Sequence, residues 1–160
     1  MTGDETQYVT LCLGAEVFAA PVTMVREILD YREPFRIPEG PDYLLGLVDV
    51  RGRGTPAIDL RVKLGMEKAP PTHTTRIMVL DVPLADRVLS LGLVADRVLE
   101  VVSFTPEQLE PPPDVGVSWR SDYIAAVVRR DGGFVVIFDL PKLLTASEAV
   151  QIAAGLNAAA

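Results

Sequence analysis

Short runs in which apolar residues alternate with polar or small residues extend along most of the chain. In the first run Val9, Leu11 and Leu13 are the apolar positions, and residues 14–16 supply a turn before residues 17–20. A period of two predicts half-buried β-strands, and two such runs around a turn predict a hairpin. Further runs lie at 45–51, 55–58, 76–82, 87–91, 97–102, 127–130 and 134–138. The pattern therefore predicts a mainly β protein.

One segment, residues 43–64, recurs in outline 80 positions later, at 123–144. Without any gap, the repeat pairs Tyr43 with Tyr123, Val48 with Val128, Gly52 with Gly132, Asp59 with Asp139, Leu60 with Leu140 and Leu64 with Leu144. A fainter match relates 21–26 to 92–97, 71 positions apart. An internal repeat indicates two similar structural units. With five short strands in each unit, we expect two small closed barrels, because closure leaves no sheet edge exposed.

The same local signals end both copies of the repeat. Glycine-containing turns at 52–54 and 131–133 each lie between two predicted strands, so each copy is expected to hold a hairpin. Asp59 and Asp139 each follow a strand and precede a Leu-x-x-x-Leu sequence, which predicts that they cap short helices. A capping-box sequence at its start predicts a final helix over 145–156.

Composition and charge limit the function classes. The chain has 160 residues, of which 49% are apolar, with 15 Lys and Arg against 22 Asp and Glu, for a net charge of −7. This acidic balance argues against nucleic acid as a partner and favours proteins. No apolar run approaches the ~20 residues of a membrane span, and the N-terminus has no secretory leader sequence. We therefore expect a cytoplasmic chain without direct membrane insertion.

Metal and nucleophilic chemistry lack a suitable set of residues. The single cysteine, Cys12, and the single histidine, His73, lie far apart in the sequence, so we expect no metal site and a structural Cys12. A remote alternative is a small hydrolase that uses Asp59 and Asp139, as the two-halved aspartic proteases use a carboxylate pair. Such proteases need Asp-Thr/Ser-Gly on a loop, whereas Asp-Leu opens a predicted helix in this chain.

Five segments together resemble the CheW family of chemotaxis coupling proteins. They lie at 25–28 (Val-Arg-Glu-Ile), 43–52, 56–61, 105–109 and 139–144. The resemblance covers nearly the whole chain and implies a single domain, 1–160. The implied fold is mainly β, with two intertwined five-stranded SH3-like β-barrels, short helices and a C-terminal helix. It also implies pseudo-repeat subdomains of approximately 15–75 and 76–145 that exchange terminal strands.

The function implied by this resemblance is that of an adaptor without catalysis or cofactor. Such a protein couples the cytoplasmic tip of a methyl-accepting chemoreceptor to the regulatory domain of a CheA-type histidine kinase, a domain of similar fold. It is cytoplasmic and is recruited to membrane receptor arrays. The alternative within the same class is a coupling protein of a non-flagellar chemosensory pathway, one that governs surface motility or gene expression.

Arg51 is the residue of the repeat that the second copy lacks, because Asp131 stands in its place. By sequence position alone, Arg51 fits a solvated turn arginine or a partner of Asp49. The family resemblance implies instead that Arg51 binds the receptor, and a planar guanidinium suits carboxylates or helix carbonyls. The receptor-contact residues implied by the resemblance are Arg51, Gly52, Glu27, Val25 and Gly46, with Leu91 and Gly92 in the groove between the barrels.

The kinase contact is implied only as a surface of the first barrel. Some coupling proteins carry a basic and an aromatic residue that join adaptor and kinase into rings, and Glu110 and Val115 occupy those places here. A second kinase contact near Glu110 and Val115 is therefore expected to differ from the family pattern. The pair Arg53-Gly54 after the Arg-Gly motif is a further departure, for which we expect a more flexible and more basic turn.

Overall fold

The computed structural model describes residues 5–38, 40–112 and 123–143. Within this part of the chain, strands predominate and the helices are short. The strands are β1 (Thr6–Leu13), β2 (Glu16–Pro21), β3 (Val25–Asp30), β4 (Leu44–Val50), β5 (Arg53–Asp59), β6 (Arg76–Pro83), β7 (Val88–Ala95), β8 (Arg97–Phe104), β9 (Ile124–Arg130) and β10 (Gly133–Phe138). The helices are η1 (Val22–Met24), α1 (Leu60–Lys63), η2 (Pro106–Gln108) and α2 (Leu140–Leu143). The predicted mainly β fold is confirmed.

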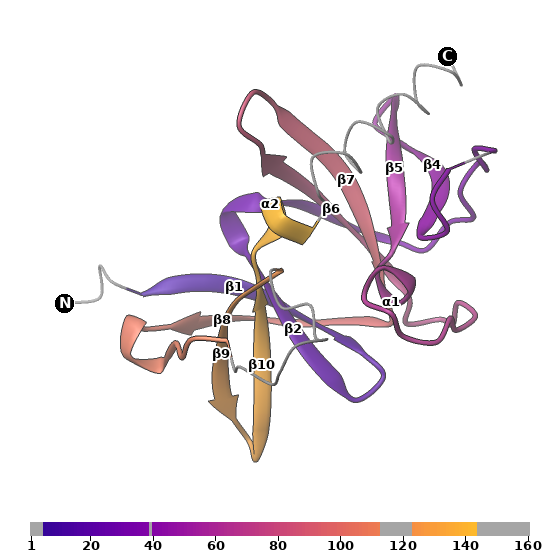
Figure 1. The fold of residues 1–160 in the computed structure, drawn as a ribbon. Coiled ribbons are helices and arrows are strands. Elements are labelled where there is room, and N and C mark those ends of the chain that lie inside the picture. The colour runs from indigo at the N-terminus through magenta and orange to yellow at the C-terminus, as the bar shows by residue number, and fades with distance from the viewer. Residues whose placement is uncertain (1–4, 39, 113–122, 144–160) are drawn as a thin grey trace.

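The strands form two five-stranded sheets of identical topology (Figure 1). The terminal sheet has the order β8-β1-β2-β10-β9, and the middle sheet has the order β3-β6-β7-β5-β4. Each sheet combines two strands from one half of the chain with three from the other, and a parallel pair joins the two sets. The two barrel-like units are therefore intertwined, as expected.

The strand register defines how the two copies correspond. Ala57 lies opposite Gly92, and Ile137, which is 80 positions after Ala57, lies opposite Ala19. Gly92 is therefore the counterpart of Ala19, an offset of 73 positions. The offset of 71 expected from matching 21–26 with 92–97 was wrong by two positions. Too few residues agree in this faint match to define the offset between the two copies. The offset of 80 for the hairpins is confirmed by the pairing of β4 with β5 and of β9 with β10.

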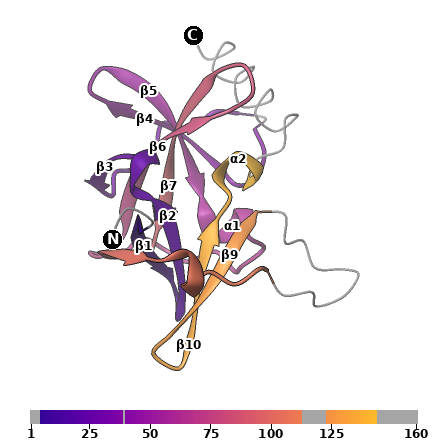
Figure 2. The same ribbon diagram turned by 90° about the vertical axis from the view of Figure 1, so that its left-hand side faces the viewer.

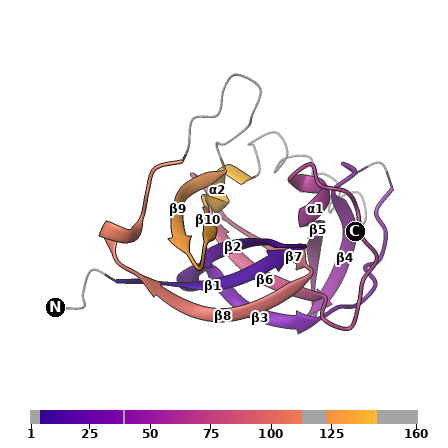
Figure 3. The same ribbon diagram turned by 90° about the horizontal axis from the view of Figure 1, so that it is seen from below.

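Alternation along the strands distributes apolar side chains among three buried clusters. In β6, Ile77 and Val79 pack inside the middle sheet, whereas Met78 and Leu80 enter a cluster shared by both sheets. Tyr8 in β1 packs inside the terminal sheet. The shared cluster lies between the sheets, which stand side by side in Figure 3, and includes Leu11, Phe18, Ile58, Leu60, Leu93, Phe138 and Leu140. Burying both faces explains why these strands are almost continuously apolar.

Short helices follow the two hairpins at equivalent places. Asp59 is the N-cap of α1, because its carboxylate accepts a hydrogen bond from the Val62 N–H at 3.4 Å. Asp139 directly precedes α2, and its carbonyl oxygen accepts from the backbone N–H groups of Lys142 and Leu143. The cap predicted at Asp59 is confirmed. The predicted final helix at 145–156 lies outside the described residues.

Gly46 marks a close approach of two backbones in the middle sheet. Phe35 and Leu47 exchange two backbone hydrogen bonds of 2.8 Å, and Gly46 has a φ of 141°. A Cβ atom at position 46 would lie 2.0 Å from the Phe35 carbonyl oxygen. The backbone positions therefore require glycine here. Glu110 and Val127 form the equivalent bridge in the terminal sheet.

Replacing this glycine should destabilise the fold independently of any partner. We expect Gly46→Ala to lower the free energy of unfolding by about 2 kcal/mol or more, since the added methyl group meets backbone atoms. Gly54→Ala is the matched control: its Cβ would lie 3.5 Å from the Leu47 side chain, an ordinary contact, so a change within about 0.5 kcal/mol is expected. Urea denaturation measures both, and equal stabilities of the two variants would contradict this account of Gly46.

Candidate functional site

Arg51 occupies the tip of the β4–β5 hairpin. Arg51 and Gly52 have φ values of 52° and 83°, and Val50 pairs with Arg53 across them. Positive φ at both central residues is the signature of the tight I′ hairpin turn. The turn predicted at 52–54 was therefore displaced by one residue, and Arg53 and Gly54 belong to β5. The expectation that Arg53-Gly54 makes the turn more flexible is wrong, because both residues lie in β5 and outside the turn.

The repeat also places its second hairpin tip in this conformation. Asp131 and Gly132 have φ values of 50° and 78°. The turn geometry is thus a property of both copies, while the side chain at its first position differs. Figure 2 shows that the two tips point to opposite ends of the molecule, the β4–β5 tip at the top and the β9–β10 tip at the bottom.

An ion pair between Arg51 and Glu27 joins the two edges of the middle sheet. The Nε of Arg51 donates to Oε2 of Glu27 at 3.0 Å. Glu27 lies on β3 and Arg51 follows β4, the strands at opposite ends of the sheet order. The sheet must therefore curl for the two residues to meet. Of the two alternatives left open by the sequence, Arg51 is the exposed turn residue, and its carboxylate partner is Glu27 rather than Asp49.

The two members of this pair differ in exposure. The Arg51 side chain is 78% exposed, whereas that of Glu27 is 19% exposed. Glu27 follows a bulge in β3, where the register against β6 shifts between Val25 and Glu27. An ion pair whose arginine is mostly exposed adds little to stability. The Arg51–Glu27 pair instead holds the exposed Arg51 side chain next to the edge strand β3. We call Arg51, Gly52 and Glu27 the Arg51 surface.

The other residues implied as receptor contacts lie deeper. Val25 is half-buried beside the shared cluster, and Gly46 is buried. Leu91 is 3% exposed and belongs to the shared cluster. Gly92 is buried too, and a Cβ there would lie 2.7 Å from Cγ2 of Ile77. Packing accounts for Gly46, Leu91 and Gly92, and the structure does not bring their side-chain positions onto the Arg51 surface. Their part in receptor binding stays a prediction.

Two exposed apolar residues near this region have no signal in the alternation pattern. Ile28, the residue after Glu27, is 41% exposed, and Phe35, beside Leu47 at the sheet edge, is 75% exposed. Exposure alternates regularly along β3, but the polar Glu27 takes a half-buried position and the apolar Ile28 an exposed one, the reverse of what polarity predicts. Phe35 lies outside the strands, where alternation gives no information.

Glu110, the residue implied for a second kinase contact, lies on the terminal sheet. Its carboxylate accepts from Nε of Arg129 at 2.9 Å, and its backbone pairs with Val127. The Arg129 guanidinium in turn lies 5.3 Å from the ring centre of Phe134. These contacts give Glu110 a structural role in tying the connection after β8 to β9. Val115 lies outside the described residues.

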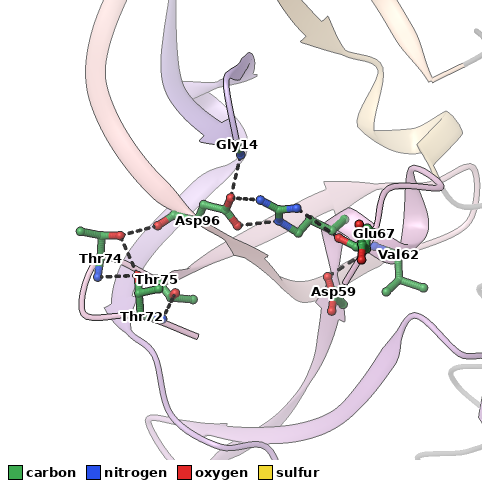
Figure 4. Close-up of polar contacts among 9 residues, drawn as sticks. Gly14, Asp59, Val62, Glu67, Thr72, Thr74, Thr75 and Asp96 are labelled. Carbon is green, nitrogen blue, oxygen red and sulfur yellow. Dashed lines mark hydrogen bonds and ion pairs between the residues drawn. The ribbon is translucent and has the colours of Figure 1, made fainter. Parts of the chain in front are cut away.

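A separate polar cluster surrounds Asp96, the residue between β7 and β8 (Figure 4). Nε of Arg61 donates to Oδ1 of Asp96 at 2.9 Å, a second guanidinium nitrogen donates to Oδ2, and the Gly14 N–H donates to Oδ2 at 2.7 Å. These hydrogen bonds, from Arg61 first, lower the pKa of Asp96 although partial burial opposes them. The bond to Asp96 likewise raises the pKa of Arg61. The sequence pattern did not indicate this cluster.

Catalytic and metal-binding arrangements find no support in the described residues. Among those residues no group of three or more His, Cys, Asp or Glu side chains is placed to hold a metal ion. Asp59 ends β5 and Asp139 follows β10, which are strands of different sheets, and the Asp59 carboxylate caps a helix. Burial raises the pKa of the half-buried Cys12 thiol, which opposes a nucleophilic role. No helix in the described part of the chain is both long and apolar enough to cross a membrane.

Comparison with known proteins gives the fold and the site a family context. The family model described as "CheW-like domain" matches residues 7–148. This chain belongs to the CheW-like family. The Chemotaxis protein CheW of Klebsiella aerogenes is 31% identical over 142 residues, which cover 89% of this chain and 83% of that protein. Protein PilI of Pseudomonas aeruginosa is 30% identical over 103 residues, which cover 62% of this chain and 56% of that protein.

A solved structure agrees with the fold. The crystal structure of the scaffolding protein TtCheW from Thermoanaerobacter tengcongensis matches with a TM-score of 0.77 over 89% of this chain and 94% of that chain, at 24% identity. Family membership makes the protein a CheW-like chemotaxis protein and not an enzyme, and the solved structure agrees in fold. The hydrolase alternative with Asp59 and Asp139 is therefore wrong.

The lowered pKa of Asp96 predicts an acid-dependent loss of stability. A carboxylate with a depressed folded pKa contributes stability that is complete above its unfolded pKa of about 3.9 and is lost as the pH falls through its folded pKa. Asp96→Asn lacks this contribution, so the difference in free energy of unfolding between wild type and variant should narrow as the pH falls below about 4. Urea denaturation from neutral to acid pH measures it. A difference independent of pH would contradict the prediction.

Proposed function

We propose that this CheW-like chain couples the cytoplasmic tip of a methyl-accepting chemoreceptor to the regulatory domain of a CheA-type histidine kinase. The observation that carries the proposal is the Arg51–Glu27 pair: an exposed arginine that the second copy of the repeat lacks, held at the edge of the middle sheet. Membership of a family of chemotaxis scaffolds supports the same reading. The adaptor would be cytoplasmic and recruited to membrane receptor arrays through its partners.

The Arg51 surface suits a helical partner with an acidic side chain or exposed helix carbonyls. Arginine binds carboxylates with its terminal nitrogens in a planar, bidentate geometry. Because Nε of Arg51 already donates to Glu27, the side chain is oriented before binding, and less conformational freedom is lost on association. Exposure of 78% leaves most of the Arg51 side chain accessible to a partner. Val25, Gly46, Leu91 and Gly92 would then support this surface by shaping the sheet beneath it.

The kinase would bind away from the Arg51 surface, although within the unit that also holds Arg51. We assign its contact to the surface of the first barrel, the unit of approximately 15–75, because the regulatory domain is itself similar in fold. A second contact near Glu110 and Val115 would differ from the family pattern, since the Glu110 carboxylate is engaged by Arg129 at 2.9 Å. Partners of this kind leave no role for nucleic acid, for a cofactor or for insertion into the membrane.

A second candidate function stays within the adaptor class. The similarity to Protein PilI favours a chemosensory pathway other than flagellar chemotaxis, such as one that governs surface motility or gene expression. The same two surfaces would serve in either pathway. The identity of the kinase bound by the purified protein distinguishes the two, because each pathway supplies its own.

Charge reversal at the Arg51 surface should selectively weaken receptor binding. We expect Arg51→Glu to lower affinity for a receptor-tip fragment by about tenfold or more, since the reversed charge repels both Glu27 and an acidic partner. Affinity for the kinase regulatory domain should be unchanged. The matched control is Arg53→Glu, which makes the same charge change two residues away on β5. Its receptor affinity should stay within about threefold of wild type. Biolayer interferometry with purified fragments measures both.

Two possible results test the proposed function and the assignment of the Arg51 surface separately. If wild type binds neither the receptor fragment nor the kinase domain, the proposed function is wrong. Unaltered receptor binding by Arg51→Glu would reject only the assignment of the Arg51 surface. Thermal unfolding of each variant verifies that a loss of binding does not reflect a loss of folding.

A further inference from the structure

The Asp96 cluster lies where the chain crosses from one sheet to the other. Asp96 separates β7 of the middle sheet from β8 of the terminal sheet. Its carboxylate binds Arg61, which belongs to α1 after β5, and the Gly14 N–H in the β1–β2 turn. One carboxylate thus connects a turn of the terminal sheet to a helix of the middle sheet. We call Gly14, Arg61 and Asp96 the inter-sheet clamp (Figure 4).

Further hydrogen bonds fix the clamp in place. A terminal nitrogen of Arg61 donates to the Glu67 carbonyl oxygen at 3.1 Å, and Oγ1 of Thr74 donates to the Asp96 carbonyl oxygen at 2.9 Å. The connection between α1 and β6 is thereby attached to both sides of the clamp. The Arg61 and Asp96 side chains are 19% and 33% exposed. Partial burial and two parallel hydrogen bonds make this pair more rigid than the exposed Arg51–Glu27 pair.

Directionality distinguishes the clamp from the other contacts between the sheets. The shared cluster holds the sheets together by burying apolar surface, an interaction that has no preferred direction. Apolar burial by itself favours contact between the sheets without specifying one rotation. The clamp, in contrast, requires the Gly14 N–H and the Arg61 guanidinium to meet one carboxylate at hydrogen-bonding distance. Such an arrangement tolerates only a narrow range of orientations.

The clamp is also absent from the second copy of the repeat. The offset of 73 positions makes Thr23 the counterpart of Asp96, and the offset of 80 makes Pro141 the counterpart of Arg61. Neither residue carries a charge. A single copy of the fold therefore forms without such an ion pair, which argues that the clamp does more than stabilise a barrel.

We propose that the inter-sheet clamp sets the angle between the two sheets, and that Asp96 and Arg61 are positioning residues of the adaptor. The angle determines where the Arg51 surface on the middle sheet points relative to the terminal sheet. The second kinase contact proposed near Glu110 lies on the terminal sheet, so this angle sets how a bound kinase is oriented relative to the Arg51 surface. An adaptor that bridges two partners needs a constant angle, because a variable one would spread the bridged complex over many orientations. This last step rests on the proposed function, whereas the angle itself does not.

The angle can be measured on the full chain without any partner. Val88 on the middle sheet and Phe134 on the terminal sheet are 62% and 53% exposed. Spin labels at Val88→Cys and Phe134→Cys, in a Cys12→Ser background, report the distance between the sheets by double electron–electron resonance. We expect one narrow distance distribution for the otherwise wild-type chain. Asp96→Ala should broaden it, and Arg61→Lys, which keeps the charge but not the parallel hydrogen bonds, should broaden it less.

A matched control removes a carboxylate that lies within one sheet. Asp30 pairs with Arg76 at 3.6 Å, and both residues lie in the middle sheet. Asp30→Asn should therefore leave the distribution unchanged. If Asp96→Ala lowers the melting temperature but keeps the narrow wild-type distribution, the clamp stabilises without orienting, and the proposal is wrong. Unfolding of both Asp96→Ala and Arg61→Lys would equally overturn a role confined to orientation.

The consequence for bridging has its own readout. Asp96→Ala should bind the receptor fragment and the kinase regulatory domain separately with affinities within about twofold of wild type. Its assembly of the ternary complex should be weaker by about fivefold or more, because the coupling between the two sites is lost. Normal ternary assembly despite a broadened distribution would reject the functional step. If wild type binds neither partner, the proposed function fails while the distance measurement still decides the role of the clamp.

Discussion

The shared hydrophobic cluster between the two sheets is the constraint on which the rest of the structure depends. Each small sheet buries one face in its own interior and the other against its neighbour. Strands such as β6, with buried Ile77, Met78, Val79 and Leu80, must then be apolar at every position, whereas an isolated barrel would need only alternate ones. Each five-stranded unit alone would be of marginal stability, since a domain of this size buries a smaller share of its surface than a larger domain does.

Much of the fold could be predicted because its signals are local. Hairpins, helix caps and the gap-free repeat depend on neighbouring residues, and the predicted strands and the Asp59 cap were confirmed. The turn at Arg51 was misplaced by one residue, because glycine content alone does not say which residues take positive φ. Contacts at long sequence separation could not be predicted. Arg51 lies 24 residues from Glu27, and Gly14 lies 82 residues from Asp96, so only the folded sheets bring each pair together.

Comparison of the two copies separates scaffold from specialisation. The terminal sheet carries a weaker counterpart of the Arg51–Glu27 contact, because Glu100 corresponds to Glu27 and lies 3.8 Å from Arg130. Joining the edge strands by an acid–base pair is therefore common to both units. What differs is the turn: arginine in one copy and aspartate in the other, on the same left-handed backbone. The scaffold thus has two equivalent turn positions, Arg51 and Asp131, whose side chains carry opposite charges.

The mixed origin of the strands has a consequence for synthesis on the ribosome. The terminal sheet pairs β1 with β8 and β2 with β10. Its first hairpin, β1–β2, can therefore complete its pairing only after these later strands have been synthesised. When translation has passed α1, neither sheet has its full set of strands, and β2 offers an unpaired apolar edge. Pairings between distant segments form slowly, and unpaired edges invite aggregation. The middle sheet, which spans residues 25–95, can form earlier, but completion of the terminal sheet is deferred until β10 has been synthesised, and the edge of β2 stays unpaired until then.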